Sequence, residues 1–182
     1  MFHGRSRVSG IVLLSFAAAF VSVPATAEMD RLGRAVQLND QGHRARAREL
    51  LETIVREEPN NHRALWNRGL VAMEDEQLDE AVGWFDRAIA IDDTRAEYHL
   101  WRGYAYAQKL RRSVWPKKPF IARRLRKSLE RAVQLDPASI EAREALMRFY
   151  EQAPGFLGGG EVRAREQAAA IRRLQSGEAA DR

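Results

Sequence analysis

The sequence contains no cysteine, which excludes disulfide bonds, thiolate metal sites, a cysteine nucleophile and lipid attachment to a cysteine. Proline and glycine are also sparse, at 6 and 12 of 182 residues, so the chain is neither collagen-like nor broadly disordered. Hydrophobic residues make up 45% and charged residues 30%, which is typical of a globular chain. The length suits one domain with a substantial core.

Residues 1–27 have the organisation of a secretory signal peptide. Two arginines near the start precede an apolar run over residues 8–23, and three small residues then end at Ala27. The run is shorter than the about 20 residues that a transmembrane helix needs. We therefore predict cleavage between Ala27 and Glu28 and a periplasmic or secreted mature chain; an uncleaved N-terminal anchor is the alternative.

The rest of the chain repeats with a period of 34 residues. Gly69 recurs as Gly103, and Ala47 recurs as Ala81, each 34 residues later. Two amphipathic stretches separated by a short polar break fill each unit, which predicts a helix, a turn and a second helix. The third unit is longer than the others by 10 residues.

The repeated glycines indicate close helix crossings. Gly69 and Gly103 fall in the middle of predicted helices, where glycine costs about 1 kcal/mol relative to alanine. Such a cost predicts that a neighbouring helix lies too close for a side chain. Ala47 and Ala81 would then be the small residues of the facing helices. Large residues should fill the space beside them: Leu51, Phe85 and Leu129.

This pattern resembles the tetratricopeptide repeat. Residues 62–95 match best, because Gly69, Ala81, Phe85 and Ala88 keep the spacing typical of that family. Because a predicted signal peptide precedes the repeats, the chain resembles an exported bacterial member of that family. It implies an all-α fold, an α-α superhelix (a solenoid) of about eight helices with a basic insertion in the third repeat. The implied units are 28–61, 62–95, 96–139 and 140–174, followed by a flexible tail at 175–182.

The resemblance also implies a concave groove lined by the first helix of each unit, which holds an extended peptide or a partner helix. Leu32 and Val36 stand where carboxylate-clamping members have Lys and Asn, so we expect an apolar or amphipathic partner segment. Trp66 and Tyr104 are candidate anchors, although they could instead pack between neighbouring units. The predicted groove residues are Arg63, Trp66, Leu70, Met73, Leu100, Tyr104 and Gln108.

The positive charge is concentrated in one segment. Between Tyr98 and Leu129 the chain has 10 Lys and Arg and no Asp or Glu, whereas residues 28–97 have 10 basic and 16 acidic residues. The segment could complement the acidic first two units, with Trp115 and Phe120 in the core. It could instead dock an acidic protein segment or anionic lipid head groups. Nucleic acid is the least favoured partner because of the predicted export. The patch residues are Lys109, Arg111, Arg112, Lys117, Lys118, Arg123 and Arg124.

A second interruption precedes the last predicted helix. Its three consecutive glycines, residues 158–160, could form a phosphate cradle. However, no Lys-Ser or Lys-Thr follows them, so they do not form a P-loop. The favoured interpretation is a long turn that Phe156 and Leu157 anchor on the apolar face.

No motif of catalysis, metal binding or cofactor binding is present. The histidines have no ligand spacing, and no Gly-x-Ser-x-Gly elbow occurs. We therefore expect a non-enzymatic scaffold or adaptor without a cofactor, which binds a protein or peptide in the cell envelope. The alternative function is a periplasmic carrier of an apolar or anionic lipid-like ligand, similar to transporter-associated members of the family.

Overall fold

The computed structural model describes residues 25–177, with side chains from residue 31 onward. The described part contains eight α-helices, one short 3-10 turn and no strand, which confirms the predicted all-α fold class. Almost all of the predicted signal peptide lies outside the described residues. The helices are α1 Ala25–Asp40, α2 Arg44–Glu57, α3 His62–Glu74, α4 Leu78–Ile91, α5 Ala96–Arg112, α6 Lys118–Leu135, α7 Ile140–Gln152 and α8 Glu161–Gln175, with the 3-10 turn at Gly155–Leu157.

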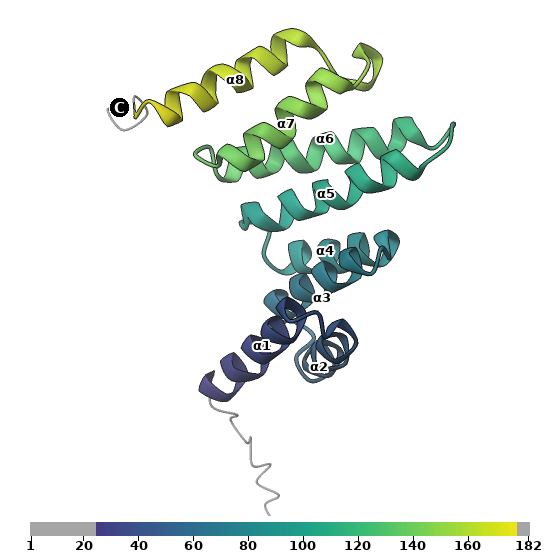
Figure 1. Cartoon of the computed structure of the whole chain (residues 1–182), viewed down its shortest axis with the longest axis vertical. Helices are drawn as coiled ribbons and strands as arrows, with labels where there is room; N and C mark the ends of the chain where they lie inside the picture. Colours follow the sequence, from purple (N-terminus) through teal and green to yellow (C-terminus); the bar gives the residue numbers. More distant parts are fainter. Residues whose placement is uncertain (1–24, 178–182) are drawn as a thin grey trace, which may run out of the picture.

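The helices form four pairs that stack along the long axis of the molecule (Figure 1). Each helix packs chiefly against the helix before it and the helix after it in the sequence. A solenoid has this property, because each repeat buries its apolar face against its immediate neighbours. The basic insertion lies where it was expected, in the third pair, and α5 and α6 are the longest helices of the described chain.

Local sequence explains where the helices begin and end. The Asn61 and Ser139 side chains accept hydrogen bonds from the backbone N–H groups of Ala64 and Ala142, which caps the starts of α3 and α7. The second helices of the first and third pairs end two residues before a proline. Proline cannot continue the helix, and it disfavours helical geometry in the residue before it.

The close crossings occur where the glycines predict them. A Cβ atom built on Gly69 would lie 2.5 Å from Cε1 of Phe85, and one on Gly103 would lie 2.6 Å from Cδ2 of Leu129. Both distances are shorter than any stable carbon–carbon contact. In the second and third pairs, the large residue of the second helix therefore occupies the space that a side chain on the first helix would need. Ala47 and Ala81 are fully buried, as expected for small residues at helix contacts.

A charged side chain is buried between the first and second pairs. Arg68 of α3 is 4% exposed, and its guanidinium donates hydrogen bonds to Glu52 of α2 and Glu80 of α4. The guanidinium carbon also lies 5.3 Å from the centre of a Trp84 ring. These contacts join three successive helices at one point.

Candidate partner-binding site

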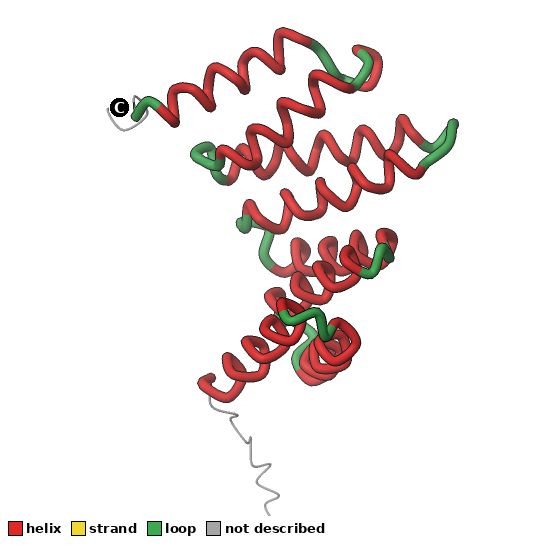
Figure 2. The backbone as a smooth tube through the Cα atoms, viewed as in Figure 1, coloured by secondary structure: helices red, strands yellow, loops and turns green. Residues whose placement is uncertain are grey.

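The two interruptions of the repeat meet on one side of the solenoid. The loop between α5 and α6 and the loop between α7 and α8 both lie at the right-hand edge in Figure 2. Their aromatic side chains are close, because the ring centres of Trp115 and Phe156 are 6.4 Å apart. The interruptions are separate features of the sequence, and the folded chain brings them together.

A pocket of about 550 Å³ lies where these loops meet α5 and α7. Apolar side chains form most of its lining, and cations stand among them from three elements: Arg111, Lys118 and Arg148. A cavity of this size and composition can hold one or two large apolar side chains of a partner. The apolar residues on which the argument depends are Tyr104, Ala107, Leu110, Ala145, Phe149 and Leu157.

Tyr104 holds a fixed position in the wall of this pocket. Its hydroxyl donates a hydrogen bond of 2.9 Å to Oε1 of Glu141, and its ring meets Trp101 edge to face. Burial, followed by the bonded carboxylate of Glu141, raises the pKa of the Tyr104 hydroxyl well above its usual value. The hydrogen bond and the ring contact together fix the orientation of the Tyr104 side chain, which lines the pocket.

Tyr104 is the member of the predicted groove that lines this pocket in the described chain. Met73 and Leu100 are 8% and 6% exposed, so the structure gives them a packing role in place of the expected groove position. Trp66 is half-buried against Tyr98, with ring centres 5.6 Å apart, and its indole Nε1 is buried without a hydrogen-bond partner. Other predicted groove residues lie half-buried or exposed outside the pocket: Arg63, Leu70 and Gln108.

The repeat itself predicts two pocket residues that the predicted groove does not include. Helix α7 begins at residue 140 and α5 at residue 96, so equivalent positions differ by 44. This offset carries Tyr104 to Arg148 and Gln108 to Gln152, and both of these α7 residues line the pocket. Extending the groove to the fourth unit would therefore have identified them. Leu157 had no such signal, because its loop has no counterpart in the other repeats.

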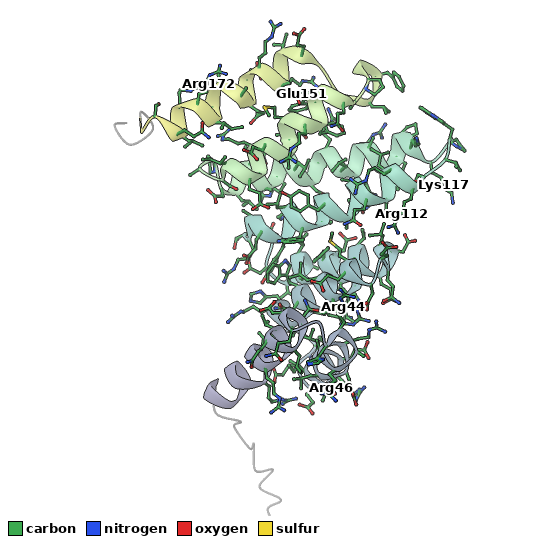
Figure 3. The ribbon with its side chains drawn as sticks, viewed as in Figure 1. Arg44, Arg46, Arg112, Lys117, Glu151 and Arg172 are labelled. Carbon is green, nitrogen blue, oxygen red and sulfur yellow. The ribbon has the colours of Figure 1, made fainter. Side chains whose placement is uncertain are left out.

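The basic segment divides into paired and unpaired cations. Lys109 forms an ion pair with Asp79, and Arg112 forms one with Glu76 at 3.0 Å, so these two cations complement the acidic second repeat. Figure 3 shows Arg112 and Lys117 near the same end of the α5–α6 pair. For the other five predicted patch cations, no carboxylate of the described chain lies within 4.0 Å: Arg111, Lys117, Lys118, Arg123 and Arg124.

The aromatic residues of the insertion face solvent, so the alternative that places Trp115 and Phe120 in the core is wrong. Trp115 is 59% exposed and Phe120 is 61% exposed. Arg124 covers one face of Phe120, with its guanidinium carbon 4.8 Å from the ring centre. Phe156 is 75% exposed and does not anchor its loop, whereas Leu157 packs against the core as expected. Exposed aromatic rings beside unpaired cations are typical of a binding surface.

The backbone conformation and close packing of the second loop require glycine at residues 158 and 159, and the three glycines form no phosphate cradle. Gly158 has a φ of +90°, and a Cβ atom on Gly159 would lie 1.7 Å from the carbonyl oxygen of Ala153. Their three N–H groups already donate within the chain. The acceptors for residues 158, 159 and 160 are the carbonyl oxygens of Gly155, Pro154 and Tyr150.

Metal-ligating clusters and membrane-spanning helices are both absent from the described residues. No group of three or more potential metal-ligating side chains occurs among residues 25–177. No helix in the same range has the length and apolarity that a membrane crossing requires.

Comparisons with known proteins identify the class. Residues 32–96 match the tetratricopeptide repeat family model. A double mutant of MamA RS-1 superposes with a TM-score of 0.67 at 17% identity, covering 87% of this chain and 80% of that chain. The thermophilic TPR protein TTC0263 of Thermus thermophilus gives 0.65 at 17% identity, covering 82% and 75%. No curated protein matches the sequence.

A third similar structure is the first TPR of Spaghetti (RPAP3) bound to the HSP90 peptide SRMEEVD. It gives a TM-score of 0.59 at 19% identity, covering 72% of this chain and 96% of that chain. At such identities the likeness shows a shared fold. Together, the stacked helix pairs and the structural matches define a helical-repeat fold, and within it residues 32–96 match the tetratricopeptide repeat family.

Proposed function

We propose that this chain is a non-catalytic interaction module that binds a peptide or a partner helix through the pocket between α5 and α7. The observation that carries the proposal is the meeting of the two loops, which produces an apolar pocket of about 550 Å³ beside exposed aromatic rings. A monomeric protein rarely exposes apolar surface of this kind without a partner. The basic loop lies beside the pocket as a secondary docking surface.

The fold supports this proposal. Members of the family expose one face of successive first helices, and α5 and α7 are the first helices of neighbouring repeats. The similar RPAP3 structure holds a peptide, so a fold of this kind can present a peptide-binding surface. Leu32 occupies a position of the carboxylate clamp, which favours an apolar contact over recognition of a terminal carboxylate.

We also place this module in the cell envelope. Support for this location comes from the leader-like sequence of residues 1–27, with its basic start, apolar run and small residues before Glu28. Mass spectrometry of the protein from a fractionated bacterial host tests the location. A periplasmic fraction that contains a chain beginning at Glu28 is expected, and an intact N-terminus in the cytoplasm would contradict it.

The binding test is a selection of random peptides on residues 25–182, followed by affinity measurement on a pocket variant. Ala107 lines the pocket, so Ala107→Trp should fill it and weaken the selected peptides by about tenfold or more. Ala90 of α4 is exposed outside the pocket, and Ala90→Trp is the matched control. Equal binding by the two variants, or no enriched peptide, would refute the proposal.

A lipid or metabolite carrier is the second candidate function. The observation that favours it is the combination of an apolar pocket with the cations Arg111, Lys118 and Arg148 at its edge, which also suits an amphiphile with an anionic head. Native mass spectrometry of the purified protein separates the two functions. A carrier retains a small ligand of defined mass that Ala107→Trp removes, and a peptide-binding module shows the mass of the polypeptide alone.

A further inference from the structure

A second pocket adjoins the apolar one. Its volume is about 330 Å³, and it lies between α6, the start of α8 and the loop over residues 155–159. Leu157 lines both pockets, so a bound chain can pass from one to the other across a single side chain. The second pocket has a different chemistry, because three arginines and no acidic residue line it: Arg123, Arg126 and Arg163.

The three guanidinium groups have few anionic neighbours. Arg123 is exposed and has no carboxylate of the described chain within 4.0 Å. The Nε of Arg126 is buried without a hydrogen bond, and its nearest carboxylate oxygen, on Glu130, is 3.9 Å away. That carboxylate also accepts a hydrogen bond of 3.0 Å from the hydroxyl of Tyr150. Glu130 therefore leaves most of the local positive charge uncompensated.

The geometry keeps the arginines together despite their mutual repulsion. Arg163 donates from Nη1 to the carbonyl oxygen of Gly158 at 2.7 Å, and its guanidinium carbon lies 5.8 Å from the ring centre of Tyr150. Arg126 lies directly against Gly158, since a Cβ atom there would be 2.6 Å from Nη1 of Arg126. The glycine thus permits the guanidinium to lie in the pocket, and two of the three cations are held by the same loop.

Guanidinium groups that line one pocket bind carboxylates strongly, because each can donate a pair of parallel hydrogen bonds to the two carboxylate oxygens. We propose that this three-arginine pocket binds the Asp or Glu side chains of a partner peptide whose apolar side chain occupies the adjoining pocket. The inference rests on the proposed peptide-binding function and specifies its partner as an acidic segment with an apolar anchor. Its carboxylates come from side chains, so no free C-terminus is needed.

The shared wall places the two parts of the partner motif on one short segment. Because Leu157 lines both pockets, an anchor in one and a carboxylate in the other belong to nearby residues of the peptide. A lipid bilayer fits this arrangement less well. Its head groups lie in a plane, whereas the arginines lie in a recess between Pro119, the 155–159 loop and α8.

The test uses the peptides selected on residues 25–182. The strongest binder is labelled, and its dissociation constant is measured by fluorescence anisotropy, together with that of a version in which Gln replaces each Glu and Asn each Asp. The variant R123E/R163E should weaken the acidic peptide by about tenfold or more and leave the neutral version unchanged. The matched control is R46E/R172E, with the same change of charge at exposed positions away from the pocket (Figure 3). Its binding should stay within about twofold.

Arg163 also holds its loop, so R123E/R163E could lose binding because the loop misfolds. The single variant R123E leaves Arg163 in place and excludes this explanation. Arg123 is exposed and has no ion-pair partner in the described chain, so R123E should fold normally and still weaken the acidic peptide. Raising the salt concentration should weaken the acidic peptide much more than the neutral one.

The outcomes separate the two proposals. Equal affinity of the acidic and neutral peptides, or equal binding by R123E/R163E and R46E/R172E, overturns the acidic-partner inference. The general peptide-binding proposal survives that result if Ala107→Trp still weakens binding by about tenfold or more, and it fails if no peptide is enriched. A vesicle competition tests a lipid surface as the alternative partner. The inference is overturned in favour of a lipid surface if phosphatidylglycerol vesicles displace the acidic peptide, phosphatidylcholine vesicles do not, and R123E no longer binds the phosphatidylglycerol vesicles.

Discussion

Gly69 and Gly83 offer a direct test of the packing argument, because the same substitution should have opposite effects at the two sites. A methyl group on Gly69 would lie 2.5, 2.7 and 3.0 Å from three atoms of the Phe85 ring. That ring is fully buried in the core. Gly83 is an exposed residue of α4, and a methyl group there would meet nothing within 4 Å.

The expected free energies follow from two opposing effects. Alanine stabilises a helix interior by about 1 kcal/mol relative to glycine, and this gain applies at both sites. Overpacking in a well-filled core costs about 1–3 kcal/mol, and this cost applies at Gly69 alone. Gly69→Ala should therefore lower the free energy of unfolding by up to about 2 kcal/mol, whereas Gly83→Ala should raise it by about 0.5–1 kcal/mol.

Equilibrium urea unfolding, followed by circular dichroism, measures both changes. A double-mutant cycle with Phe85→Leu identifies the clash, because the smaller side chain leaves room for the new methyl group. The destabilisation by Gly69→Ala should become smaller in the Phe85→Leu background, with a coupling of about 0.5–2 kcal/mol. Equal effects of the two glycine substitutions, or strictly additive effects in the cycle, would refute the close-crossing explanation.

Three further predictions concern stability and use the same unfolding assay. Arg68→Ala should lower the free energy of unfolding by about 2 kcal/mol, because it removes a buried cation that joins three helices while its half-exposed glutamate partners regain water. Arg68→Met should lower it less, since methionine keeps the packed part of the side chain. Ser139→Ala should cost about 1 kcal/mol by removing the cap on the N–H of Ala142, and Ser139→Asp should cost little. Burial lowers the pKa of His99 below its usual 6.5, so the unfolded chain binds the proton more readily and stability should fall as the pH drops below that value. His99→Gln should flatten this part of the pH profile, and an unchanged profile would contradict the assignment.

The sequence contained enough information for the helix pairs and their crossings. The 34-residue recurrence of Gly69 and Gly103 predicted the contacts with Phe85 and Leu129, because a repeat fixes which positions face each other. The predicted groove lies further toward the N-terminus than the pocket, and only Tyr104 belongs to both in the described chain. Leu100 has the periodicity of a groove residue, but close stacking of neighbouring repeats buries its side chain.

The pocket could not be predicted, because it depends on two loops that break the repeat. Nothing in the local sequence indicates that Trp115 and Phe156 approach each other, since each belongs to an insertion with no equivalent in other units. The charge pattern was also ambiguous. The sequence showed an excess of cations but not that Lys109 and Arg112 pair with the second repeat, while Lys118 and Arg123 have no carboxylate within reach in the described chain.

The most direct test of the binding site is a map of backbone amide NMR shifts when a selected peptide is added to ¹⁵N-labelled residues 25–182. The largest shifts are expected on α5, α7 and the two loops around Trp115 and Leu157. Largest shifts on α2 and α4 instead, with these loops unaffected, would contradict the proposed binding site.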